Sequence, residues 1–194
     1  MSHHRYQTEA VILGSVPRGE SDRVFFLFTK DMGLIPASAQ GIRNLPSKLR
    51  YTLSDFGALE VDLIRMEDMW RIVDAEERPI IFSAPHSDAL RAFVRIAGLL
   101  RRLMRGERKE AVLFDGCMQF RNFLLTEKLL PKECRDAEIA MAVKVLHELG
   151  YGGESRESKT VSSESFSREL ISFVAAHRHT LVSFTNARLN ESHL

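Results

Sequence analysis

Hydrophobic positions follow a strand-like pattern up to about Arg78. Short runs rich in Val, Ile, Leu and Phe are separated by turn residues such as Gly14 and Gly33, and residues 58–64 alternate apolar with acidic side chains. Short runs with glycine turns are typical of small barrels and sandwiches. The pattern predicts five strands, at about residues 10–13, 23–29, 34–39, 58–64 and 69–75.

Beyond Pro79 and Pro85 the apolar spacing becomes helical. Ser87 is a candidate N-cap for a helix that runs toward Gly106. The apolar side of this helix is predicted to hold Leu90, Phe93, Val94, Ala97, Leu100, Leu103 and Met104. Further helices are predicted at about residues 109–125, from Pro131 to Gly150, and as one or two helices within 166–176 and 181–189.

Residues 152–165 are rich in Ser, Glu and Gly, which predicts a loop. The fold class that follows is α+β in the sense of a β-barrel plus α-helices. We expect a five-stranded barrel in residues 1–80 and a helical bundle in residues 81–194.

Composition narrows the class of protein. The chain has 194 residues, 44% of them hydrophobic, and a net charge of only +1, so any affinity for phosphate must come from local patches. Cys117 and Cys134 are too few for a four-thiolate zinc site, and they are expected to be free thiols in a reducing compartment. The first residues hold no apolar signal core and no run of eighteen apolar residues occurs, which predicts a cytoplasmic protein that does not enter a membrane.

Charge is uneven along the predicted barrel. Residues 18–50 hold six basic and three acidic side chains, whereas residues 55–77 hold eight acids against Arg65 and Arg71. The segment 41–50 is a long basic loop, and charged loops on small barrels often carry the binding function. Two interpretations stay open for it: a nucleic-acid contact, or an ordinary solvated loop.

The first predicted helix carries a row of arginines. Arg91, Arg95, Arg102 and Arg105 fall within an arc of roughly 80° on a regular helix. Residues 91–109 hold seven basic side chains against Glu107 alone. Like charges at this spacing repel, which favours an anionic partner. The alternative is that these arginines cover a neighbouring helix or pair with acids elsewhere in the fold.

The sequence gives little indication of a catalytic site. The chain has no GxxxxGK[ST] phosphate loop, and its histidines lack the context of a metal site. The acids Glu67, Asp68, Asp74, Glu76 and Glu77 are candidate Mg²⁺ ligands of a nuclease, but all lie on one predicted hairpin. We therefore expect a protein that is not an enzyme and that has no cofactor and no metal, with the nuclease as a minor alternative tested at Asp68 or Asp74.

Several short motifs of the N-terminal half occur in an order that resembles the RecO family of recombination mediators. Together they span about residues 6–77. They are Tyr6-Gln7-Thr8-Glu9-Ala10, Gly19-Glu20-Ser21-Asp22-Arg23, Leu27-Phe28-Thr29, Gly33-Leu34, Ala39-Gln40-Gly41-Ile42-Arg43, Ser47-Lys48-Leu49 and Ala75-Glu76.

The resemblance implies an OB-fold domain joined to a helical domain. It also implies binding to single- and double-stranded DNA, annealing of complementary strands, contact with the C-terminal tail of SSB, and loading of RecA together with RecR. Of the motif residues, Arg23, Arg43 and Lys48 are the best DNA candidates, while Gln40 replaces a lysine usual in the family. With the charge pattern, the expected DNA-binding set is Arg23, Lys30, Arg43, Lys48, Arg50, Arg91, Arg95, Arg102 and Arg105.

Partner contacts are less defined by the sequence. The basic residues Arg121, Lys128, Lys132 and Arg135 are candidates to receive an acidic tail such as that of SSB. A second hypothesis follows, in which the chain is an adaptor of the same fold that binds acidic tails and has only weak affinity for DNA.

Overall fold

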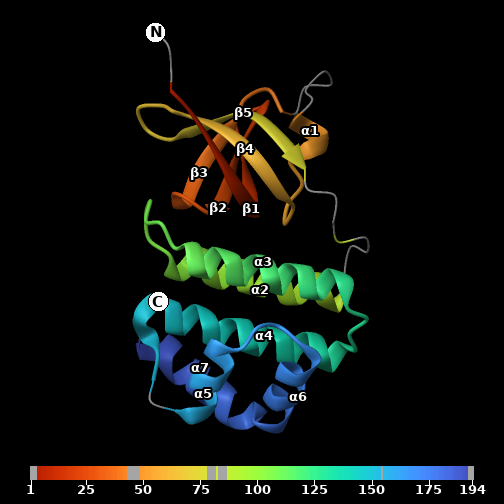
Figure 1. Cartoon of the computed structure of the whole chain (residues 1–194). Helices are drawn as coiled ribbons and strands as arrows, with labels where there is room; N and C mark the ends of the chain where they lie inside the picture. The colour runs from red at the N-terminus through yellow and green to blue at the C-terminus, as the bar shows by residue number, and fades with distance from the viewer. Residues whose placement is uncertain (1–3, 43–48, 78–81, 83–86, 154, 192–194) are drawn as a thin grey trace. The chain divides into compact units, whose positions relative to one another are not determined.

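The N-terminal strands close into a barrel. A computed structural model describes residues 4–42, 49–77, 82, 87–153 and 155–191. The strands are β1 (Arg5–Arg18), β2 (Asp22–Thr29), β3 (Gly33–Ala39), β4 (Ala58–Arg65) and β5 (Trp70–Glu77), and a short helix α1 (Leu49–Thr52) precedes β4. Their order around the barrel is β1-β2-β3-β5-β4, antiparallel except for the β3–β5 pair (Figure 1). The predicted five-stranded OB-fold barrel is confirmed.

One long strand closes this barrel. β1 pairs with β4 through residues 5–11 and with β2 through residues 10–18, and its register shifts between Ile12 and Ser15. Gly14 lies in that shift with a φ of 131°, a value that suits glycine, and glycine within a strand commonly marks such a bend. The predicted strand end at Gly14 was wrong, because the bend continues the strand to Arg18.

Alternation along β2 sorts its aromatic side chains. Phe25 is fully buried in the barrel core, and Phe26, the next residue, is outside that core and half-buried. Ile12, Leu63 and Trp70 pack with Phe25 inside the barrel. The period of two that is typical of strands therefore holds for β2.

The helices that follow are α2 (Asp88–Leu103), α3 (Ala111–Thr126), α4 (Pro131–Leu146), a π-turn η1 (His147–Tyr151), α5 (Arg156–Ser163), α6 (Arg168–Ala176) and α7 (Arg178–Glu191). α4 packs against α2, α5, α6 and α7 (Figure 1). The predicted helix end at Gly150 falls within the π-turn, where Gly150 has a φ of 85°. The chain divides into two compact units, one of Met1–Ile81 with Arg105–Phe114, the other of Phe82–Met104 with Asp115–Leu194.

α2 begins as predicted but ends earlier. The Ser87 hydroxyl accepts a hydrogen bond from the Leu90 amide at 3.1 Å, which caps the helix. Val94 is 39% exposed, contrary to the prediction, because it is turned about 100° from buried Phe93. The helix ends at Leu103, so Arg105 lies beyond it and outside the predicted helical row.

The predicted loop at residues 152–165 contains a helix, α5. The Ser155 hydroxyl accepts from the Ser158 amide at 3.3 Å as an N-cap, and Val161 is fully buried. At the other end, the Lys144 ammonium donates to the carbonyls of Ser162 and Glu164. Burial of one face and caps at both ends therefore override a composition typical of loops.

Candidate nucleic-acid interface

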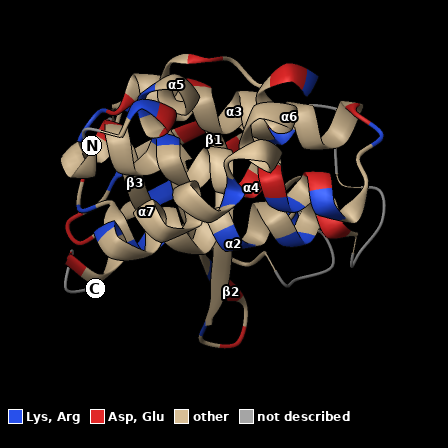
Figure 2. Cartoon of the chain, turned by 90° about the horizontal axis from the view of Figure 1, so that it is seen from below, with Lys and Arg blue, Asp and Glu red and all other residues tan. Residues whose placement is uncertain are grey.

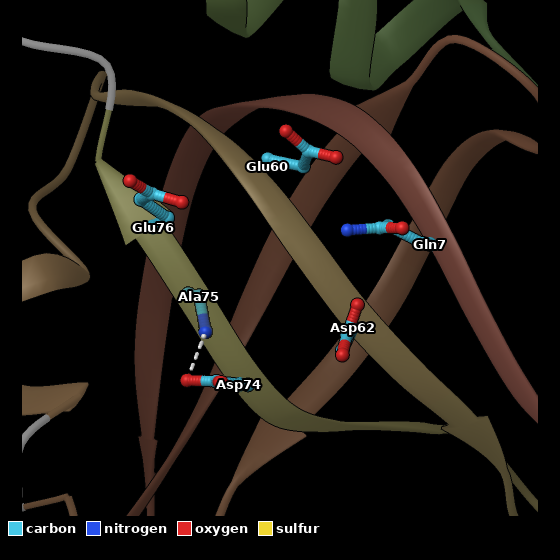
Figure 3. A pocket seen from close by; sticks show the side chains of 6 residues that line it. All are labelled: Gln7, Glu60, Asp62, Asp74, Ala75 and Glu76. Atoms are coloured by element: carbon cyan, nitrogen blue, oxygen red, sulfur yellow. Dashed lines mark hydrogen bonds between the residues drawn. The ribbon is translucent and has the colours of Figure 1, made fainter.

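One outer wall of the barrel is acidic. Gln7, Glu60, Asp62, Asp74, Ala75 and Glu76 line a hollow of about 100 Å³ on β1, β4 and β5 (Figure 3). One Asp74 carboxylate oxygen accepts from the Ala75 amide at 3.0 Å. Four carboxylates on one surface repel phosphate, so this wall is a poor contact for nucleic acid.

The acidic hairpin does not gather the predicted magnesium ligands. Of the five acids considered for a nuclease, only Asp74 and Glu76 line the hollow. Within the described residues, no group of three or more His, Cys, Asp or Glu side chains is arranged to hold a metal ion.

The basic residues of the barrel differ in their partners. Arg23 donates to the Ser15 hydroxyl at 2.6 Å and lies 3.8 Å from the Asp55 carboxylate, and Lys30 donates to Glu9 at 3.3 Å. Arg50 on α1 is exposed, and no carboxylate of the described residues lies within 4 Å of it. Arg43 and Lys48, the other motif candidates, lie outside the described residues.

The segment Arg105–Phe114 belongs with the barrel although it follows α2 in the chain. Lys109 donates to Asp31 at 2.9 Å, and this hydrogen bond is the main reason that the pKa of Asp31 lies below its usual value. Glu107 accepts from the Trp70 indole at 3.1 Å. At Gly33, which has a φ of +70°, a Cβ atom would lie 2.0 Å from the Arg108 carbonyl oxygen. The close approach therefore requires glycine there.

Two of the helical arginines are paired with acids. Arg95 donates to both carboxylate oxygens of Glu138 at 2.6 Å, and this bond raises the pKa of Arg95. Arg91 lies 3.3 Å from Asp88. The expectation of pairing with acids elsewhere in the fold therefore holds for Arg95.

Two of the four arginines in the predicted row have no acidic partner among the described residues. Arg102 and Arg105 are exposed, and within the described part of the chain no carboxylate lies within 4 Å of either guanidinium. Figure 2 shows Lys and Arg positions in blue along α2. Among the predicted DNA-binding residues that the structure describes, these two side chains and Arg50 have no acidic partner.

A groove lies between α2 and α4. It has a volume of about 380 Å³ and is lined by Asp88, Arg91, Arg95, Pro131, Cys134, Arg135, Glu138 and Ile139. Arg135 is exposed at its rim, and Cys134 is 3% exposed at its floor. Burial raises the pKa of the Cys134 thiol, so the floor is uncharged. The groove is therefore lined by both arginines and apolar side chains.

The comparisons with known proteins concern mainly the barrel. Residues 1–76 match the family described as recombination protein O N terminal. The chain is 30% identical over 102 residues to the DNA repair protein RecO of Rubrobacter xylanophilus, and 30% identical over 103 residues to that of a Synechococcus strain. The N-terminal barrel of this chain is therefore similar to the N-terminal domain of RecO proteins.

The match to these RecO proteins is partial in length. It covers 52% of this chain and 41% of the Rubrobacter protein, and 53% of this chain and 35% of the Synechococcus protein. A third RecO, from Dehalococcoides mccartyi, is 40% identical over 62 residues, which are 32% of this chain and 24% of that protein. The chain thus matches less than half the length of each relative.

The helical part of the chain changes the set of residues that can contact a partner. Arg121 is 1% exposed, and its guanidinium lies 5.7 Å from the centre of the Phe82 ring, so it is not available at the surface. Lys128 and Lys132 are exposed but do not line the groove, and Arg135 does. No helix in the described ranges is both long and apolar enough to cross a membrane.

The groove itself was missed by the sequence analysis. Its arginines were assigned to two separate sets, Arg91 and Arg95 to DNA and Arg135 to a partner. These residues meet because α2 packs beside α4. The contact is distant in the sequence, since Arg95 and Glu138 are 43 residues apart in the chain. Helical spacing within one segment carries no information on that contact.

Proposed function

We propose that the chain acts in DNA repair and recombination as a mediator without catalytic activity. In this proposal it binds single- and double-stranded DNA, anneals complementary strands, and helps RecR to load RecA onto SSB-coated DNA in the cytoplasm. Its DNA-binding domain is the barrel of residues 1–80, with which Arg105–Phe114 packs, and its helical domain lies within residues 81–194. The observation that supports this proposal best is the OB-fold barrel, which matches the RecO N-terminal family.

The distribution of charge supports the same proposal. One barrel wall carries four carboxylates, whereas Arg50, Arg102 and Arg105 are exposed without an acidic partner among the described residues. In this proposal, phosphates contact these arginines rather than the acidic wall. Arginine suits this contact, because its planar fork of donors matches the phosphate oxygens.

Annealing needs no reacting group. Two DNA strands repel each other through their phosphates, and bound arginines lower that repulsion while the bases remain free to pair. Each neutralised phosphate also releases a condensed counterion, which makes binding favourable at low salt. The mechanism therefore relies on positioned positive charge.

The proposal predicts faster annealing of complementary oligonucleotides. One strand would carry a fluorophore and the other a quencher, and the rate of quenching would be followed with and without the protein. We expect the protein to raise the annealing rate severalfold at low salt. This increase should disappear at high salt, because the release of counterions then no longer favours binding. Equal rates with and without protein, under conditions where the protein binds each strand, would contradict the annealing function.

A second candidate function is supported by the groove between α2 and α4. Its arginines suit carboxylates, and the apolar residues of its lining, Pro131, Cys134 and Ile139, suit an apolar side chain. This combination fits an acidic peptide such as the SSB tail, which would compete with Asp88 and Glu138 for Arg91 and Arg95. The groove thereby supports an adaptor role beside DNA binding.

The adaptor role predicts that Arg135→Glu weakens binding of a labelled peptide of the acidic SSB tail by about tenfold, since a charged contact becomes a repulsion. Lys132→Glu is the matched control, because Lys132 is exposed on the same helix but outside the groove. Fluorescence anisotropy gives both affinities. Equal losses in the two variants would indicate nonspecific attraction rather than a tail site.

A further inference from the structure

Tyr51 is the most exposed of the large apolar side chains in the described residues, at 76%. It lies on α1, the short helix between β3 and β4. Leu49 and Leu53, on the opposite side of this turn, pack against the barrel core. Because residues one and two positions after Leu49 are turned by about 100° and 200°, Arg50 and Tyr51 face away from the core.

The backbone that carries Tyr51 is held firmly. The Leu53 amide donates to the Leu49 carbonyl at 2.9 Å, and the Ser54 amide donates to the Thr52 carbonyl at 3.1 Å. The Ser54 hydroxyl then donates to Glu77 at the end of β5, at 3.3 Å. The tyrosine ring is therefore presented to solvent by a turn that is fastened to the barrel.

An isolated exposed ring differs from a protein-docking patch. Among the described residues, none of the other strongly exposed large apolar side chains lies in α1 or in the turn that follows it. Protein interfaces usually require a contiguous apolar area of several such side chains. A single ring instead suits a flat aromatic ligand, which needs only its π-face.

The charges beside Tyr51 favour an anionic ligand. Arg50 precedes it, is exposed, and has no carboxylate within 4 Å among the described residues. The two nearby acids are already bonded, because Asp55 accepts from Ser15 at 2.6 Å and Glu77 accepts from Ser54. A ligand that joins a flat aromatic group to a phosphate matches this pair of side chains, and a nucleotide within a DNA strand is such a ligand.

We propose that Tyr51 stacks on an unpaired nucleobase while Arg50 contacts an adjacent phosphate. This inference rests on the DNA-binding function proposed above and adds a preference to it. Bases of a duplex are already stacked above and below, so they offer no face to the tyrosine. α1 therefore makes the barrel favour single-stranded over double-stranded DNA, with little dependence on sequence because every base has a π-face.

The test compares variants at one exposed position. Tyr51→Leu keeps apolar area and removes the ring, whereas Tyr51→Phe keeps the ring. We expect Tyr51→Leu to bind a labelled oligo-dT about five- to tenfold more weakly, and Tyr51→Phe to bind as the parent chain does. Affinity for a duplex of equal length should be unchanged in both variants.

A second tyrosine serves as the control. Tyr6 is 41% exposed, but its ring already packs edge-on against Trp70, with centroids 5.2 Å apart. Tyr6→Leu is therefore expected to leave the affinity for oligo-dT unchanged. A second check uses the parent chain alone. Its affinity for an oligonucleotide of abasic residues should be lower than its affinity for oligo-dT, by the same factor by which Tyr51→Leu lowers the affinity for oligo-dT.

The outcomes separate this inference from the proposed function. If the parent chain binds neither single strands nor duplex, the DNA-binding function fails. If it binds both and Tyr51→Leu matches the parent chain, or loses single-strand and duplex affinity equally, the stacking site fails while the function stands. A Tyr51→Phe variant as weak as Tyr51→Leu would also overturn stacking, because it retains the ring.

Discussion

Replacing Arg178 by methionine is expected to lower the free energy of unfolding by about 3 kcal/mol, because it leaves a buried carboxylate without its partner. Arg178 begins α7 and donates through Nε and Nη2 to the two oxygens of Asp136, each at 2.7 Å. Asp136 is 1% exposed and lies on α4, the helix against which α2, α5, α6 and α7 pack. Urea unfolding followed by circular dichroism measures the change.

Arg168→Met is the matched control for this ion pair. Arg168 begins the preceding helix, α6, and pairs with Glu127 at 3.0 Å and Glu133 at 3.4 Å, but these side chains are more exposed than Asp136. Exposed ion pairs contribute about 1 kcal/mol or less. If Arg178→Met lowered the free energy of unfolding no more than Arg168→Met does, the burial of Asp136 would not make its ion pair with Arg178 more important to stability.

Reversing the charge at Arg102 and Arg105 together is expected to weaken binding to single-stranded DNA about thirtyfold at low salt. Each lost phosphate contact is taken as about 1 kcal/mol. The slope of log affinity against log salt should also fall by about 1.4, since each contact with a single strand contributes about 0.7. Fluorescence anisotropy of Arg102→Glu/Arg105→Glu against the parent chain measures both quantities.

The control for this pair carries the same change in net charge at another place. Arg156 and Lys159 lie exposed on α5, and Arg156→Glu/Lys159→Glu changes the total charge by the same amount. We expect it to reduce the affinity much less, because the effect depends on contact rather than on net charge. Equal losses in the two double variants would remove Arg102 and Arg105 from the proposed contact.

The barrel could be predicted from the sequence because its signals are local. Alternation of apolar and acidic side chains marked the strand that is β4, and glycine turns separated the predicted strands. The prediction that the first strand ends at Gly14 was wrong for a physical reason. Glycine permits both a turn and a bend within a strand, and the pairing of β1 with two neighbours selects the bend. Whether a glycine ends a strand depends on partners that are distant in the sequence.

The binding residues were less predictable than the fold, since pairing decides which charges remain available. The row of arginines was visible in the sequence, but the pairing of Arg95 with Glu138 depends on α4 packing beside α2. The same holds for Lys109, whose partner Asp31 is 78 residues away. Tyr51 was overlooked because exposure cannot be derived from its neighbours alone, and α1 was taken as part of a basic loop.

The central claim is that this chain binds DNA through exposed arginines. It is tested most directly by fluorescence anisotropy of a labelled oligo-dT, titrated with the protein from about 50 mM to about 200 mM salt. Three phosphate contacts, one each for Arg50, Arg102 and Arg105, would give a slope near −2.1, so the affinity should fall by roughly twentyfold over that range. No binding at the lowest salt, or an affinity that does not change with salt, would contradict the account.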